Sequence, residues 1–124
     1  MKFVLLVNES ADWPSLSAQQ RAEIAQACDR WHHDLQKRGI GFAGIGLHPP
    51  AESFCVRKSN GRPLITDGPF AETHEVLGGF ELIECADRAE AESIAATFPA
   101  LDVGFTLEIR RVLAGDDLRQ HLGM

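Results

Sequence analysis

A group of ionisable side chains follows a bend in the chain at residues 67–69. Two carboxylates, a hydroxyl and an imidazole come within four residues: Glu72, Thr73, His74 and Glu75. An imidazole and a nearby carboxylate can exchange protons with a bound ligand, and crowding of ionisable groups shifts their proton affinity. The pattern therefore predicts a polar pocket wall in which Asp67 and His74 act as acid and base on a small substrate.

Other residues are candidates for contacts with that substrate. Arg57 lies in a strand from which it can reach the segment. His32 borders the apolar stripe of a predicted helix whereas His33 opposes it, so one of the two can line a cleft while the other faces solvent. The full set of predicted substrate-binding residues is Arg57, Phe70, Glu72, Thr73, Glu75 and His32.

A purely structural interpretation of the same residues stays open. Asp67 stands before a Gly-Pro pair, where a carboxylate commonly accepts backbone hydrogen bonds and shapes a turn. Phe70 then anchors the bend to the core, and an isolated histidine such as His74 in a charged stretch is usually solvated.

Metal and cofactor chemistry has little support in the residue spacing. His32 and His33 are adjacent, so they point about 100° apart on a helix and cannot share a metal ion. The three cysteines, at positions 28, 55 and 85, include no Cys-x-x-Cys pair. Free thiols are expected, with no metal and no cofactor.

Hydrophobic periodicity places these residues on a small set of elements. Strands are expected at residues 3–7, 40–47, 80–85 and 105–110, and helices at 17–39 and 87–98. A hairpin of residues 54–58 and 62–66 turns at Asn60-Gly61, a dipeptide that tolerates positive φ, and register then places Val56 opposite Ile65. The helical stripe of Ile24, Cys28, Trp31 and Leu35 is expected to pack on the sheet.

The order of these elements predicts the fold class. When the hairpin is left out, the remaining elements form two βαβ-like halves. This indicates an α+β, ferredoxin-like sandwich with an inserted hairpin. At 124 residues the chain fits a single domain spanning 1–124. Residues 114–124 include few apolar side chains and are expected to form a C-terminal tail or a short helix.

Charge and hydropathy exclude some partners and compartments. The formal net charge is −6, which disfavours nucleic acid and anionic membrane surfaces as partners. The apolar run of the first strand is five residues, too short for a signal peptide or a membrane span. A cytoplasmic location is expected.

The segment from Thr66 to Phe80 resembles the DGPF group of YCII-related proteins, named for the residues at positions 67–70. The resemblance extends to the Leu47-His48-Pro49-Pro50 turn, the Val56-Arg57 strand and the last strand at residues 108–110. His74 departs from the pattern, because relatives usually carry lysine there. Membership implies a ferredoxin-like fold whose sheets pair into a dimeric α+β barrel, with a cleft near the DGPF segment.

Some YCII-related proteins are thought to use a pair of one histidine, on the first helix, and one aspartate, near the next strand. This sequence has no residue-by-residue match for that pair, because the strand at residues 40–47 contains no aspartate.

Two functions follow as hypotheses. The first is a small-molecule-binding homodimer that acts as a cofactor-independent lyase or isomerase through acid-base chemistry at the DGPF segment. The alternative is a non-catalytic regulatory or sensor module, since relatives are often encoded beside extracytoplasmic-function sigma factors. An enzyme needs a titrating group beside a pocket, whereas a protein-binding module needs an exposed apolar patch.

Overall fold

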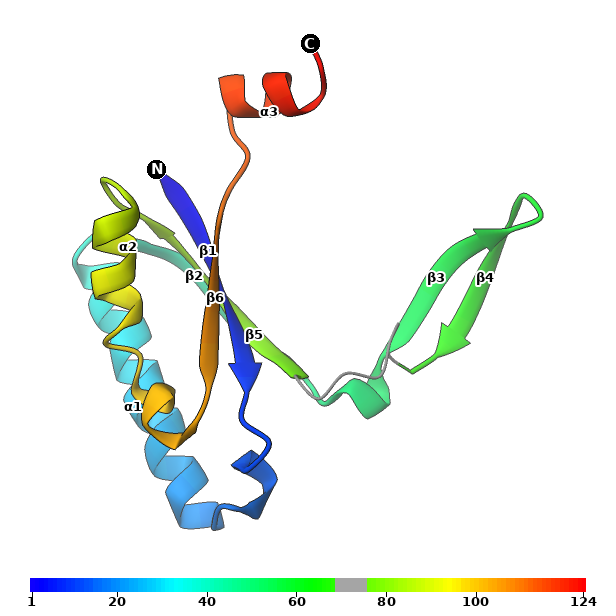
Figure 1. Ribbon diagram of the computed structural model, residues 1–124. Helices are drawn as coiled ribbons and strands as arrows, with labels where there is room; N and C mark the ends of the chain where they lie inside the picture. The colour runs from blue at the N-terminus through cyan, green and yellow to red at the C-terminus, as the bar shows by residue number, and fades with distance from the viewer. Residues whose placement is uncertain (69–75) are drawn as a thin grey trace.

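The computed structural model describes residues 1–68 and 76–124 and has a mixed α+β fold (Figure 1). Four strands form an antiparallel sheet in the order β2-β5-β1-β6, with bounds Lys2–Glu9 (β1), Gly41–Gly46 (β2), Val76–Glu84 (β5) and Thr106–Arg111 (β6). Two more strands, Phe54–Ser59 (β3) and Arg62–Asp67 (β4), pair with each other. The helices described are Ala18–Lys37 (α1), Arg88–Ala95 (α2) and Asp116–His121 (α3). The predicted α+β class is confirmed.

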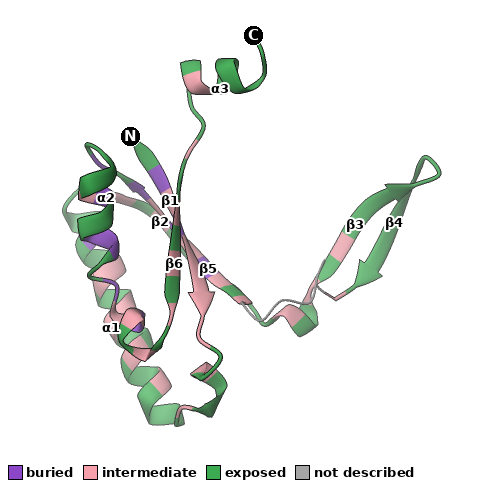
Figure 2. Ribbon diagram, in the orientation of Figure 1, coloured by how far each residue is buried: buried purple, intermediate pink, exposed green. Residues whose placement is uncertain are grey.

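The core lies between the sheet and the two longer helices, which cover the same face of it (Figures 1 and 2). Strand β1 is central, as its apolar sequence predicted, and pairs with β5 on one side and β6 on the other. Leu5 and Ile83 are fully buried on the helix face, where they meet Leu35 of α1. Alternation along the strands leaves Val4, Leu6 and Leu82 half-buried on the opposite face.

Local signals set the helix ends. Ser17 and Gln20 form the predicted capping box, in which each side chain bonds the other's backbone N–H. Asp87 caps α2 by accepting from the N–H of Glu90. That helix ends at Ala95, earlier than predicted, because Phe98 is extended before Pro99, and Pro99 starts a separate 3-10 turn, Pro99–Val103.

The hairpin has the predicted register, with Val56 opposite Ile65 and Ser59 opposite Arg62. Both turn residues have positive φ, 52° at Asn60 and 76° at Gly61. Figure 1 shows the hairpin standing away from the four-stranded sheet, as an inserted element. Phe54, Val56 and Ile65 share one face of it and are each more than 60% exposed.

The last residues form the short helix α3, which is mostly exposed. In the parts of the chain that the structure describes, no helix has both the length and the apolar content needed to cross a membrane.

Candidate functional site

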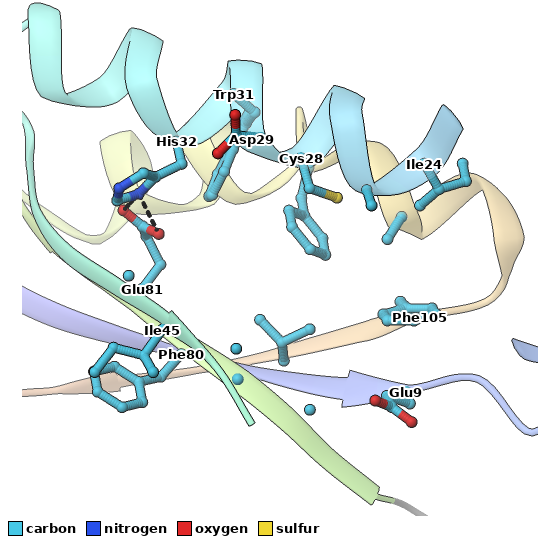
Figure 3. Close-up of a pocket in the computed structure, with 18 of the residues that line it drawn as sticks. Glu9, Ile24, Cys28, Asp29, Trp31, His32, Ile45, Phe80, Glu81 and Phe105 are labelled. Atoms are coloured by element: carbon cyan, nitrogen blue, oxygen red, sulfur yellow. Dashed lines mark hydrogen bonds and ion pairs between the residues drawn. The ribbon is translucent and has the colours of Figure 1, made fainter. Parts of the chain in front are cut away.

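A pocket of about 430 Å³ opens between α1 and the four-stranded sheet (Figure 3). Aromatic side chains supply much of its wall: Trp13, Trp31, Phe98 and Phe105. Pockets of this size that are mostly apolar and contain a few polar groups are typical of small-molecule sites.

The pocket exists because α1 packs tightly on the sheet only near its C-terminal end. Leu35 is 1% exposed against the core, whereas Ile24, Cys28 and Trp31, earlier on the same stripe, line the pocket. Trp31 is held aside by its indole N–H, which donates to the hydroxyl of Thr97 at 2.9 Å, and by an edge-on contact with Phe98. The predicted stripe therefore forms core at one end and a pocket wall at the other.

A histidine and a carboxylate meet at one end of the pocket. Nδ1 of His32, on α1, lies 2.7 Å and 2.9 Å from the two carboxyl oxygens of Glu81, on β5. The Glu81 residue is 5% exposed, and the His32 side chain is 22% exposed. His33, its neighbour, is 58% exposed and faces Asp29. The expectation that one of the two histidines lines a cleft is confirmed for His32.

Gly44 leaves the space in which this pair forms. It is the cross-strand neighbour of Glu81 on β2, and its missing side chain would point at the pair. A Cβ at Gly44 would overlap Oε2 of Glu81 and lie 2.8 Å from Nδ1 of His32. Close approach of these two side chains to the backbone accounts for the glycine at position 44.

The electrostatics of the pair suit proton transfer. Burial raises the pKa of Glu81, and the hydrogen bond and charge of His32 partly lower it again. When Glu81 is ionised, Nδ1–H of His32 donates to it, which places the lone pair on Nε2. None of the described residues hydrogen-bonds to Nε2. With Nδ1–H bonded to Glu81, Nε2 is the ring nitrogen that can accept a proton.

Burial shifts the pKa of two other groups that line the pocket. Burial raises the pKa of the Glu9 carboxyl at the end of β1. Burial also raises the pKa of the Cys28 thiol, with a backbone hydrogen bond at Ala100 acting in the opposite direction. A thiol whose pKa is raised carries little thiolate near neutral pH, so Cys28 acts as an apolar wall residue.

The other predicted site residues lie elsewhere. Asp67 ends β4 on the hairpin, is exposed and pairs in register with Phe54; Arg57 is on β3. Neither is among the described residues that line the pocket. Gly68 has a φ of 92°, and its N–H donates to the backbone carbonyl of Ser53. Five predicted residues lie outside the described residues: Phe70, Glu72, Thr73, His74 and Glu75.

Sequence reasoning missed Glu9 and Glu81, the two carboxylates at opposite ends of the pocket. Glu81 stands two residues before Ile83 on an alternating strand, so period-two spacing places it on the buried face. Glu9 follows Leu5 and Val7 at the same spacing. A carboxylate in the apolar register of a strand was the available signal, and pairing it with His32 required the tertiary structure.

Comparison with known proteins gives a family and a fold. The family model of the YCII-related domain matches residues 1–114. Uncharacterized protein R00369 of Rhizobium meliloti (strain 1021) is 47% identical over 65 residues, which are 49% of this chain and 52% of that protein. The chain thus spans about half the length of the curated relative that it matches.

A similar fold is found among solved structures. One of them is 5-chloro-2-hydroxyhydroquinone dehydrochlorinase from Burkholderia phenoliruptrix AC1100, in complex with 2,5-dihydroxybenzoquinone. The TM-score is 0.53 with 14% sequence identity, over 94% of this chain and 97% of the other. At this identity the likeness concerns the fold alone.

Proposed function

We propose that this chain, which belongs to the YCII-related domain family, binds a small molecule in the pocket and acts on it by acid-base catalysis without a cofactor. The observation that carries the proposal is the contact between Nδ1 of His32 and Glu81, 2.7 Å long, at the end of an aromatic-walled pocket. Many lyase and isomerase reactions need only a positioned base and acid.

In this mechanism Nε2 of His32 removes a proton from the bound molecule. The imidazole becomes an imidazolium, and the carboxylate of Glu81 stabilises its charge through the Nδ1–H bond. The same imidazolium can then return the proton to another atom of the ligand, which gives an isomerase, or to a leaving group, which gives a lyase.

The fold relative is compatible with this chemistry. A dehydrochlorinase removes hydrogen and chloride from its substrate, and loss of a proton to a base is one half of that reaction. A ring of similar size is therefore a reasonable first substrate to test on this chain.

The test uses hydroxylated six-membered rings, including 5-chloro-2-hydroxyhydroquinone, in anaerobic D₂O without added metal or cofactor. Deuterium incorporation and product formation are followed by NMR. His32→Asn should lower the rate by about 10²–10⁴-fold, as expected for loss of a general base. His33→Asn is the matched control, because His33 is adjacent and exposed, and it should keep the parent rate. Equal rates in all three proteins would exclude His32 as the base.

We propose further that the chain is a homodimer of ferredoxin-like units whose sheets pair into an α+β barrel. The sheet face opposite the helices carries half-buried Val4, Leu6 and Leu82, and an apolar sheet face is normally covered. The apolar face of the hairpin is a second surface that pairing can bury, since a lone hairpin is marginally stable in water. Light scattering should give twice the 13.6 kDa of the monomer at micromolar concentration; a stable monomer would contradict this assembly.

A regulatory or sensor role is the second candidate. The exposed apolar hairpin face favours it if a protein partner, and not a second copy of this chain, covers that face. Phe54, Val56 and Ile65 form the kind of patch that a protein partner, including one in a sigma-factor pathway, can bind. The NMR assay separates the roles. A sensor binds a ring without turning it over, and its ligand response persists in His32→Asn.

A further inference from the structure

We propose that Glu9 is a second polar contact of the pocket, which binds a hydroxyl group of an uncharged ring while the His32–Glu81 pair acts on the other end of that ring. This inference rests on the proposed function and specifies its substrate class. Three independent features of the pocket support it: the position of Glu9, the charges of the lining, and the shape of the walls.

Glu9 lies at the end of the pocket away from the histidine. Figure 3 shows Glu9 and Phe105 at one end and the His32–Glu81 pair at the other. Glu9 reaches the pocket face because it keeps the odd-numbered register of Phe3, Leu5 and Val7 on β1. A ligand that spans the pocket therefore meets one carboxyl group at each end.

The backbone of the neighbouring strand makes room for Glu9. The pairing of β1 and β5 shifts between Val7 and Asn8, opposite Gly78. A Cβ at Gly78 would lie 2.7 Å from both Cγ and Oε1 of Glu9. Gly44 serves Glu81 in the same way, so Glu9 and Glu81 each have a glycine beside them.

Glu9 is available to a ligand. Among the described residues, its carboxyl has no hydrogen-bond or ion-pair partner. Burial raises the pKa of this carboxyl, which favours the protonated form. A protonated carboxyl can donate to an oxygen of the ligand and accept from another hydroxyl.

The charges of the lining select an uncharged ligand. The acidic residues of the lining are Glu9, Asp29 and Glu81, and the described lining contains no lysine or arginine. An anionic ligand would therefore lose its hydration without gaining a lysine or arginine partner. Trp13, Trp31 and Phe105 present flat apolar surfaces, which suit a ring.

The test compares two simple probes, phenol with one hydroxyl group and hydroquinone with two at opposite ends of the ring. Both tryptophans of the chain line the pocket, so their two indole N–H signals in a ¹H–¹⁵N NMR spectrum report binding. The parent should bind hydroquinone about tenfold more tightly than phenol, since a hydrogen bond to a carboxyl group is worth about that factor.

Glu9→Ala should reduce this preference to the twofold that follows from the two equivalent hydroxyl groups of hydroquinone, with phenol affinity unchanged. Asp29→Ala is the control, because Asp29 is an acidic lining residue whose side chain is 69% exposed, and it should keep the tenfold preference. 4-Hydroxybenzoate, an anion, should bind the parent at least tenfold more weakly than phenol does. In Glu9→Ala the ratio of these two affinities should be smaller.

The outcomes distinguish the two proposals. Two results would overturn the role of Glu9 and leave the acid-base function intact. In one, Glu9→Ala keeps the tenfold preference for hydroquinone; in the other, Glu9→Ala loses affinity for phenol and hydroquinone by the same factor. A parent that binds neither probe would overturn the assignment of a ring ligand and, with it, the acid-base function proposed for such rings.

Discussion

Replacing Gly44 with alanine is expected to break the contact between His32 and Glu81. The new methyl group would occupy the position of Oε2 of Glu81 and approach Nδ1 of His32 to 2.8 Å. The Glu81 carboxyl is the end of a flexible side chain, so it can rotate away while the backbone stays in place. The fold should therefore survive while the pair separates.

The hydrogen bond between His32 and Glu81 sets the size of the effect on stability. A hydrogen bond to a charged group contributes about 1.5–3 kcal/mol. Glu81 is 5% exposed, so its displaced carboxyl finds few other hydrogen-bond partners. Gly→Ala also reduces the entropy of the unfolded chain, which offsets about 0.4–1 kcal/mol. The free energy of unfolding should fall by about 1–2 kcal/mol, or roughly 4–8 °C in Tm.

Gly46→Ala is the matched control on the same strand, because a Cβ at Gly46 has no heavy atom within 4 Å. It should be neutral or slightly stabilising in urea unfolding. Imidazole ¹⁵N NMR should show Nδ1 of His32 protonated in the parent and in Gly46→Ala, but a mixture of tautomers in Gly44→Ala. If the two variants match in stability and in the imidazole spectrum, Gly44 does not create the space for the pair.

Three other outcomes are expected. Gly61→Val should lower the free energy of unfolding by about 1 kcal/mol or more, because φ is 76° there; an unchanged Tm would refute the turn assignment. Glu9→Gln should be more stable than the parent above pH 4.5, the ordinary pKa of a glutamate, and the difference in stability should grow until the pH passes the raised pKa of Glu9. The reason is that burial penalises only the charged carboxylate. A difference in Tm that does not change with pH would contradict burial as the cause of the raised pKa. Asp67→Asn should leave stability within about 1 kcal/mol and ring binding unchanged, because Asp67 is exposed and outside the described lining. Loss of activity in a folded Asp67→Asn protein would instead support the sequence-based assignment of Asp67 as an acid or base.

Elements with local signals could be predicted from the sequence. Ser17 with Gln20 starts a helix through hydrogen bonds between residues three apart, and Asn60-Gly61 sets a hairpin register through positive φ. Both signals act within a few residues, so no distant contact is needed to interpret them. Helical periodicity is also a local signal, and it placed His32 at the border of the apolar stripe, where a side chain can line a cleft.

The site itself depends on contacts that no local pattern encodes. His32 and Glu81 are 49 residues apart, and they meet because β5 lies beside β2, the strand that α1 contacts, and because Gly44 of β2 leaves the space between them. Periodicity predicts which face of a strand a side chain occupies, but strand order decides its neighbours. The residues of the α1 stripe likewise share one face by sequence alone. Only the packed structure determines that Leu35 meets the core while Ile24 and Cys28 face a pocket, because Trp31 is held aside by Thr97 and Phe98.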